Sequence, residues 1–391
     1  MFFVFFSLIS SKPKDNDLLI TQDMVDMINS NSNSSFKARL YPKFAKMTIK
    51  DAKRFLTPVR SPPKKQGSAI PVGADETRYK GNKNFIFAGI WQQDLSSTAE
   101  KTYQVPIYDV THLCSSWAPA VTSAMSVSVG RWANRFMNFS LQFVLDCDIL
   151  GDACIERSAL NAYSLFWKTK IPEASRWDDP LSPTSPRKSN LQAPVSSLTS
   201  EICLNPTGCY PGTTGCTRSY ALTGSCDPSD DESKCPIYFL YNWRWIKSHL
   251  FEVGPVTSSI LVQSQFFMYD SGVYSSADGS GDILGMLDVT IYGWGQEDTS
   301  VEPTATKKRW WWISPHLGCD FGIAYDDISS SDSAYTLSNV AARHINGGSN
   351  CAKGFMKFNR RFDDSLIESF AIGPTPYNFV PGEWPVQQQA Q

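Results

Sequence analysis

The chain has 391 residues, of which 42% are apolar and 13% aromatic, and this is enough to bury one large core or two modest ones. Lysine and arginine number 36 and aspartate and glutamate 38, so the formal net charge is −2. This balance gives no electrostatic basis for binding DNA or RNA, and no nucleic-acid partner is expected.

The N-terminal part begins with an apolar run over residues 1–12, which suits the core of a secretory signal. The run is far shorter than the ~20 residues that span a bilayer, so no transmembrane span is expected. Residues 22–29 and 47–55 are predicted to be helical within a segment from 18 to 60. Residues 61–84 are rich in Pro, Lys and Gly and are predicted to be a linker.

A globular body is predicted over residues 85–378. Small and apolar residues at helical spacing predict a buried helix over 115–132, with Pro119 in its first turn. Residues 255–262, 272–275, 289–292 and 309–314 are predicted strands separated by Gly- and Asp-rich turns. This order predicts an α+β body with a helical lobe at about 100–245 and a β lobe at about 246–373. Residues 379–391 are predicted to form a flexible tail.

Ten cysteines indicate an oxidising compartment. Five of them crowd together without the C-x-x-C spacing of a zinc site and without a histidine, so disulfides are expected and no metal or cofactor is. Asn33 and Asn138 begin glycosylation sequons, which function only in the secretory route. The expected location is therefore the extracellular space or a lysosomal or vacuolar lumen. The disulfide candidates are Cys147, Cys154, Cys203, Cys209, Cys216, Cys226, Cys235, Cys319 and Cys351, the last two closing an insertion.

Residues 107–118 resemble the segment around the nucleophile of papain-like cysteine peptidases, most closely the cathepsin B subfamily, through Ser115, Trp117 and Ala118. Residues 251–256, 266–274, 293–295 and 354–369 resemble β-lobe segments of that family in the same order. Residues 20–56 resemble its propeptide, and the crowded cysteines occupy the place of the occluding loop. The resemblance implies a papain-like two-lobe fold, with an antiparallel β-barrel-like lobe and a propeptide-like N-terminal segment.

The resemblance also implies a reaction that needs a cysteine thiolate, a histidine, an asparagine that orients it, and an oxyanion-binding glutamine. In this chain these four positions hold, in the same order, Ser116, Leu287, Pro315 and Val110. Losing one triad member costs on the order of a million-fold in turnover in a serine protease. A catalytically inactive protein is therefore predicted, similar to the non-catalytic tubulointerstitial nephritis antigen type, acting through protein partners and keeping the propeptide-like segment docked in the cleft.

Two other functions remain open. A peptidase could use Ser116 with a recruited base, His112 or His316, although a buried serine that caps the helix start is favoured. A ligand- or glycan-binding module could use the altered cleft, where Glu156 and Arg157 replace glycines of the family. The other binding candidates are Trp117, Trp294 and the run Trp310-Trp311-Trp312, which is predicted to be a core strand with one or two rings exposed.

Overall fold

The structure is a computed structural model. It describes residues 14–61, 85–86, 105–113, 116–132, 138–146, 159–160, 162–163, 171–172, 174, 219–222, 237–278, 281–296, 308–323, 344–346, 349–351, 353–360, 364–374 and 379–381. Over these residues the fold is α+β, as the sequence predicts.

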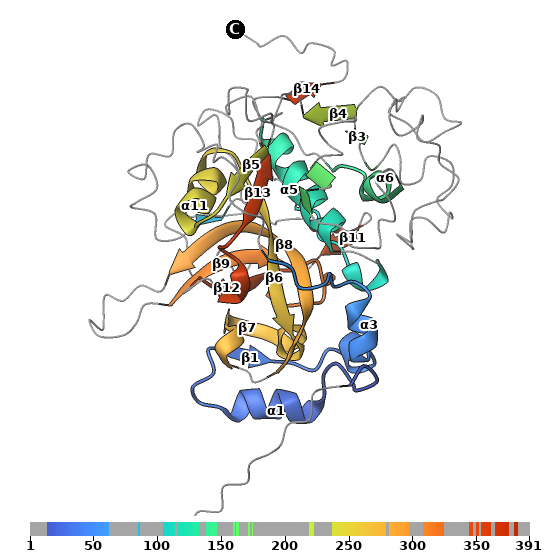
Figure 1. Ribbon diagram of the computed structural model, residues 1–391, viewed down its shortest axis with the longest axis vertical. Helices are drawn as coiled ribbons and strands as arrows, with labels where there is room; N and C mark the ends of the chain where they lie inside the picture. The colour runs from blue at the N-terminus through green and yellow to red at the C-terminus, as the bar shows by residue number, and fades with distance from the viewer. Residues whose placement is uncertain are drawn as a thin grey trace, which may run out of the picture.

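A nine-stranded sheet forms the centre of the molecule (Figure 1). In spatial order its main path is β1 (Phe36–Ala38), β7 (Tyr269–Tyr274), β12 (Met356–Asn359), β9 (Arg309–Ser314), β8 (Ile283–Gln296), β6 (Val256–Gln263), β13 (Ala371–Pro374) and β5 (Ile237–Leu240), while β2 (Phe85–Ile86) pairs with β8. Neighbours are antiparallel except for the pair of β7 and β12. The four predicted strands are confirmed, and β8 is much longer than predicted.

The helical lobe is built around α5 (Trp117–Trp132), which confirms the predicted buried helix. Its small side chains, such as Ala120 and Ala124, are fully buried and let the helix approach β8 and β6 closely. Together with α6 (Leu141–Asp146) it packs in a second hydrophobic cluster, which also takes in Ile237 of β5 and Ile372 of β13 at one end of the sheet.

Several smaller elements complete the described chain. They are η1 (Val110–His112), β3 (Ile171–Pro172), β4 (Ser219–Leu222), α11 (Trp243–Glu252), η3 (Ser264–Met268), η4 (Ser276–Asp278), β10 (His344–Asn346), β11 (Ser349–Cys351), η5 (Asp364–Leu366) and β14 (Phe379–Pro381). The predicted lobe boundary near 245 lies within α11, and residues 379–381 at the start of the predicted tail form β14, which pairs antiparallel with β4.

The N-terminal segment folds into α1 (Gln22–Ser30), α2 (Pro42–Ala45) and α3 (Ile49–Lys53), and this confirms the two predicted helical patches. Thr21 caps α1 by accepting a hydrogen bond from the Met24 amide, and Thr48 and Asp51 form a capping box on α3. In Figure 1 the segment lies beneath the sheet, and β1 runs beside β7.

The segment is part of the main hydrophobic core and not an appendage to it. Phe44 is fully buried, and its ring centroid lies 5.3 Å from that of Phe267 and 6.0 Å from that of Phe321. Gly272 has φ +86°, and a Cβ there would lie 2.6 Å from the Ser35 carbonyl oxygen, so only glycine lets β1 approach so closely. The segment's buried apolar residues in this core are Leu19, Ile20, Val25, Ile28, Phe36, Ala38, Tyr41, Phe44, Ile49, Ala52, Phe55 and Leu56.

Some predictions concern residues outside the described chain. These are the signal-like run 1–12, nearly all of the linker, Glu156, Arg157 and the cysteines at 147, 154, 203, 209, 216, 226 and 235. Cys319 is disulfide-bonded, while the side chain of Cys351 is not described, so the predicted pairing of these two cysteines stays a prediction. None of the helices in the described part is long and apolar enough to cross a bilayer.

Candidate functional site

The start of α5 faces β8 across the boundary between the lobes. Ser116, immediately before the helix, is fully buried, and its Oγ accepts a hydrogen bond of 2.9 Å from the Asp288 amide. The same Oγ lies 3.3 Å from Asp288 Oδ2, to which it donates. The predicted buried position is confirmed, but the hydroxyl bonds across the lobe boundary instead of capping helix N–H groups. Ser116 and Asp288 thus form a buried pair that links α5 to β8.

Asp288 is held in place from a second side. The hydroxyl of Ser259, directly opposite on β6, donates to Asp288 Oδ1. The carboxyl group is almost fully buried, and this burial raises its pKa to about 6, although the hydrogen bonds from Ser259 and Ser116 and the charge of Arg60 oppose the rise. A carboxyl group with this pKa exchanges its proton near neutral pH.

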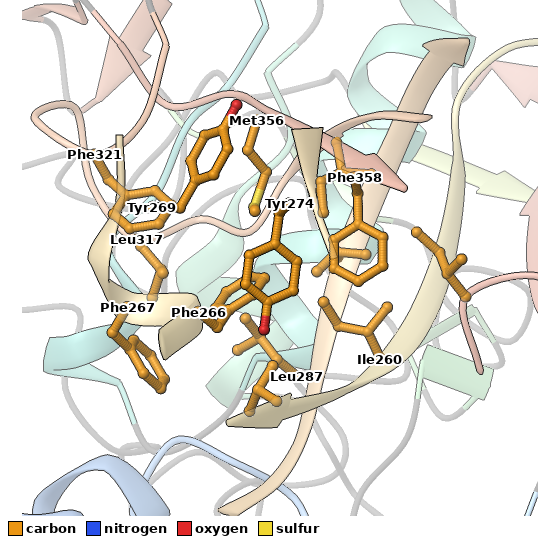
Figure 2. Packing of buried hydrophobic residues seen from close by; sticks show 14 of the residues in the cluster. Ile260, Phe266, Phe267, Tyr269, Tyr274, Leu287, Leu317, Phe321, Met356 and Phe358 are labelled. Atoms are coloured by element: carbon orange, nitrogen blue, oxygen red, sulfur yellow. The ribbon is translucent and has the colours of Figure 1, made fainter. Parts of the chain in front are cut away.

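The predicted histidine position, Leu287, points the other way. Consecutive strand residues face opposite sides of a sheet, so Leu287 enters the core while Asp288 meets Ser116. Figure 2 shows Leu287 in the cluster that also holds Ile260 and Phe266, and Leu287 is fully buried. Leucine has no group that accepts a proton, so this position contributes packing and no chemistry.

The residues at the other two predicted positions, Val110 and Pro315, have side chains without a hydrogen-bonding group. Val110 lies in η1, is fully buried and presents no hydrogen-bond donor on its side chain. Pro315 follows β9, and proline lacks the amide that could orient an imidazole. The next residue, His316, is fully buried with φ +52°.

Neither predicted rescue base faces Ser116. The Nε2 of His316 lies 2.9 Å from Thr290 Oγ1, and its Nδ1 lies 3.4 Å from the Tyr108 amide that donates to it. Burial lowers the pKa of His316 to about 3, so the ring is neutral and bound to other partners. His112 is exposed on η1. Among the described residues, the side chain that Ser116 meets is therefore a carboxyl and not an imidazole.

The predicted binding aromatics are buried. Trp117 and Trp294 are at most 1% exposed, and all three rings of the run Trp310-Trp311-Trp312 lie in the core. The expectation that one or two of that run would be exposed is wrong, because the face of β9 away from the main core packs on a third cluster that contains Ile107 and Phe355. These rings offer no platform to a ligand arriving from solvent.

The end of the N-terminal segment reaches β8 just before this site. Thr57 and Met286 exchange two backbone hydrogen bonds of 2.9 and 2.8 Å, and the Arg60 amide donates to Met286 Sδ at 3.2 Å. Gly285 has no side chain, and a Cβ there would lie 2.9 Å from the Thr57 carbonyl oxygen. Residues 57–60 are therefore seated two positions from Asp288, on the strand that carries it.

A second anchor holds the segment near η1. Lys43 Nζ contacts Asp109 Oδ2 at 3.4 Å and Asp320 Oδ1 at 2.9 Å, and it also donates to the Leu317 carbonyl oxygen. Lys43 and Asp109 are each about one-fifth exposed, whereas Asp320 is 62% exposed, so solvent weakens the ion pair with Asp320 more than the one with Asp109. Contacts with the segment thus come from both sides of the lobe boundary.

The sequence did not single out Asp288 or Ser259. Gly293, Trp294 and Gly295, which the sequence suggested to be a turn, lie inside β8. Counting back from them assigns a position along the strand, and one further step reverses the face on which a side chain lies. Nothing in the sequence shows that β8 and β9 change register between Ile291 and Gly293. The carboxyl group of Asp288, next to the counted position Leu287, is the sequence signal that could have led us to consider either residue as the one that faces Ser116.

The two predicted glycosylation residues differ in their surroundings. Asn33 is exposed in the turn after α1, and its amide donates to the side chain of Asn31. Asn138 is half-buried, and its Oδ1 accepts a hydrogen bond from the Tyr108 hydroxyl at 3.4 Å. Exposure therefore favours Asn33 as an acceptor, and both remain predictions.

A helical lobe and a β-rich lobe, with the start of a buried helix facing a strand across their boundary, define the class of two-lobed papain-like proteins. A family model described as "Papain family cysteine protease" matches residues 93–324. The chain belongs to this family.

Comparison with individual proteins agrees on the fold. The procathepsin B S9 structure from Trypanosoma congolense has a TM-score of 0.58 at 19% identity, over 92% of this chain and 99% of that one. Procathepsin L2 from Tenebrio molitor larval midgut has a TM-score of 0.52 at 15% identity, over 90% and 89%. Falcipain-2a of Plasmodium falciparum is 24% identical over 74% of this chain, which spans about half of that protein's length. The fold is thus papain-like, with neighbours that carry propeptides.

Proposed function

We propose that this protein is a non-catalytic, cathepsin B-like member of the papain family that acts by binding other proteins. The observation that carries the proposal is the buried pair of Ser116 and Asp288 at the start of α5. Peptide hydrolysis in this family needs a thiolate beside an imidazole and an oxyanion donor. Ser116, Leu287 and Val110 supply none of these groups.

The burial of the site supports the same proposal. Ser116 is fully buried and Asp288 is 2% exposed, so a substrate carbonyl has no direct approach to the hydroxyl in this state. A nucleophile must lie within about 3–3.5 Å of the atom it attacks. The lone pair of Ser116 Oγ that would attack is moreover engaged by the Asp288 amide.

We further propose that the N-terminal segment stays docked in the mature protein. Without peptidase activity the chain cannot process itself, and the segment fills part of the main core. Burying a large apolar side chain contributes roughly 1.5–3 kcal/mol, so releasing residues such as Phe44 and Phe55 would be costly. The partner surfaces would then lie outside the cleft that the segment occupies.

The test measures cleavage of a broad peptide library by full-length protein, with Ser116→Ala as the control. No cleavage above that of the control supports the proposal. Mass spectrometry of the native protein provides the second readout, in which an intact chain through residues 61–84 is expected. A mature protein that begins near Phe85, or turnover that Ser116→Ala abolishes, would contradict the proposal.

A serine hydrolase is the second candidate, and Asp288 is the observation that favours it. Asp288 Oδ2 could take the proton of Ser116 Oγ while that oxygen forms a bond to a substrate carbonyl carbon. The protonated carboxyl would then return the proton to the leaving group, and water would release the acyl group from the serine by the reverse sequence. A pKa of about 6 suits this exchange.

A fluorophosphonate probe separates the two candidates, because it labels an activated serine covalently. Labelling of the wild type that is lost in both Ser116→Ala and Asp288→Asn would establish the hydrolase. Labelling in none of the three supports the non-catalytic protein. The remaining alternative, ligand binding in a cleft lined by Glu156 and Arg157, rests on residues outside the described chain, and no contact among the described residues supports it.

We place the protein in the secretory route, in a lysosomal, vacuolar or extracellular setting. The disulfide at Cys319 and the exposed sequon at Asn33 support this location. Removal of N-linked glycans should lower the apparent mass of the native protein, and Asn33→Gln should abolish part of that change. If glycan removal changes the mass of neither the native protein nor Asn33→Gln, this would count against passage through the secretory route.

A further inference from the structure

A group of positive charges and indole rings lies apart from the Ser116–Asp288 pair, where α11 covers the sheet. We call it the tryptophan–cation cluster, and it consists of Trp243, Lys247, Trp294, Arg309, Trp311 and Arg360. Trp243 and Lys247 lie one turn apart on α11, and Trp294 lies on β8. In Figure 1 this helix lies against the side of the sheet that carries β8 and β9.

The cations are held against ring faces. The Arg360 guanidinium carbon lies 4.9 Å from the ring centroid of Trp243 and 5.2 Å from that of Trp311, so it is sandwiched between two indoles. Lys247 Nζ lies 4.5 Å from the ring centroid of Trp294. These distances are within the ~6 Å range of cation–π attraction, which fixes both charges in position.

The cluster carries more positive than negative charge. Glu368 is the carboxylate that faces it, and this group accepts a hydrogen bond of 3.0 Å from Trp311 Nε1 and lies 3.9 Å from Arg360 Nε. Burial, together with the charges of Arg360 and Arg309, lowers the pKa of Lys247 to about 7, while the charge of Glu368 opposes this shift. Among the described residues, Lys247, Arg309 and Arg360 thus lie close enough to repel one another, and Glu368 is the carboxylate that faces them.

The cluster opens to solvent on one side. Lys247 and Arg360 are each 9% exposed, while Trp243 is 36% exposed and Arg309 is exposed at the start of β9. The Arg360 amide donates to the Arg309 carbonyl oxygen at 3.0 Å, so the two residues are adjacent across β12 and β9. A ligand that reached this rim would meet the exposed part of Trp243 together with guanidinium groups, including that of Arg244, whose central carbon lies 5.3 Å from the Trp243 ring centroid.

We propose that the tryptophan–cation cluster is a binding site for a sulfate or phosphate group carried on a sugar ring. The oxyanion would offset the repulsion among Lys247, Arg309 and Arg360, because guanidinium groups bind such anions through charge-assisted hydrogen bonds. The sugar ring would pack on the exposed part of Trp243. None of these residues contacts Ser116 or Asp288 in the contacts that the described residues make.

An acidic peptide fits the site less well. An extended peptide gains affinity by pairing its backbone with an unpaired strand edge. Here β9 is paired with β8 on one side and with β12 on the other, so it offers no free edge. A sugar needs no backbone partner, and its apolar ring face suits an indole.

Isothermal titration calorimetry on the full chain tests the proposal with three probes: inorganic sulfate, a sulfated disaccharide and the same disaccharide without sulfate. The sulfated disaccharide should bind at least about tenfold more tightly than either other probe. The unsulfated disaccharide lacks the one or two charge-assisted contacts of the oxyanion, and inorganic sulfate lacks the contact of the sugar ring. Lys247→Met and Arg309→Gln should each weaken its binding by about tenfold or more. Lys46→Gln, the same loss of charge at an exposed residue of the N-terminal segment, should leave it unchanged.

Thermal unfolding of each variant accompanies the titrations. Arg309 is exposed, so Arg309→Gln tests the site even where Lys247→Met fails to fold. Absence of binding by the sulfated disaccharide would overturn the proposal, as would equal weakening in Arg309→Gln and Lys46→Gln. Equal affinity for the sulfated and unsulfated disaccharides would reject the oxyanion, and equal affinity for inorganic sulfate would reject the sugar. A peptidase assay is not needed for any of these outcomes.

Discussion

The buried carboxyl group of Asp288 should make the stability of this protein depend on pH in a way that one substitution removes. Burial raises the pKa of Asp288 from 3.8 to about 6. Between these two pH values the folded chain holds the proton that the unfolded chain has released, so the free energy of unfolding falls as the pH rises. The difference between the two pKa values corresponds to about 3 kcal/mol of the free energy of unfolding. The wild type has this contribution below about pH 4 and has lost all of it above about pH 6.

Asp288→Asn keeps the shape of the side chain and removes its charge. The amide can accept the hydrogen bond from Ser259 through its oxygen and donate to Ser116 through its nitrogen, because hydroxyl groups serve as donors or acceptors. The variant should therefore be more stable than the wild type above pH 7, by up to about 3 kcal/mol. Below about pH 4 the two proteins should be equally stable.

Urea unfolding followed by tryptophan fluorescence, repeated from pH 3.5 to 8, measures this difference. Other carboxyl groups titrate over the same range, so the quantity of interest is the difference between variant and wild type. Asp282→Asn, at an exposed position just before β8, is the matched control and should follow the wild type. If the free energies of unfolding of Asp288→Asn and the wild type differ by the same amount at every pH, the inference that a buried carboxyl faces Ser116 is wrong.

Three further predictions concern the core and the site. Phe44→Ala should lower the free energy of unfolding by about 3–5 kcal/mol and speed tryptic cleavage of the N-terminal segment, as a buried aromatic ring is lost. Gly272→Val should loosen β1, because the new Cβ meets Ser35, and hydrogen exchange at the Val273 amide, which donates to the Ser35 carbonyl, should rise. Ser116→Cys with Asp288→His should place an imidazole beside the thiol and lower the thiol pKa below neutral, seen as thiolate absorbance, whereas Ser116→Cys with Leu287→His should not.

Elements with local signals were predictable from the sequence. The helix α5 follows from small apolar residues at helical spacing, and β9 follows from its run of tryptophans bounded by polar residues. The N-terminal segment showed its helices through caps such as Thr48 and Asp51, which act within one turn. In each case the information needed lies within a few residues of the element.

Features that depend on distant partners were not predictable. The tail residues of β14 form a strand only because β4, more than 150 positions earlier, offers a partner. The burial of the whole run Trp310-Trp311-Trp312 depends on residues such as Ile107 and Phe355, which pack on its second face. The meeting of Ser116 and Asp288 spans 172 positions and turns on which face of β8 each residue takes. Periodicity shows that side chains alternate between the two faces of a strand, but it does not show which of the two sets of side chains faces a given packing partner.

On the proposed non-catalytic function, the residues at these positions connect the loss of chemistry to the proposed retention of the N-terminal segment. A catalytic nucleophile has to be reachable, and this requirement keeps its surroundings open; once it is lifted, Ser116, Leu287 and Val110 can all be buried, as they are here. A closed site no longer needs the segment to leave, so the segment can add side chains such as Phe44 to the core and pair with β7 and β8. The β lobe then depends on the segment for its stability, and any surface used for recognition has to lie elsewhere on the molecule, as the rim around Trp243 and Arg309 does.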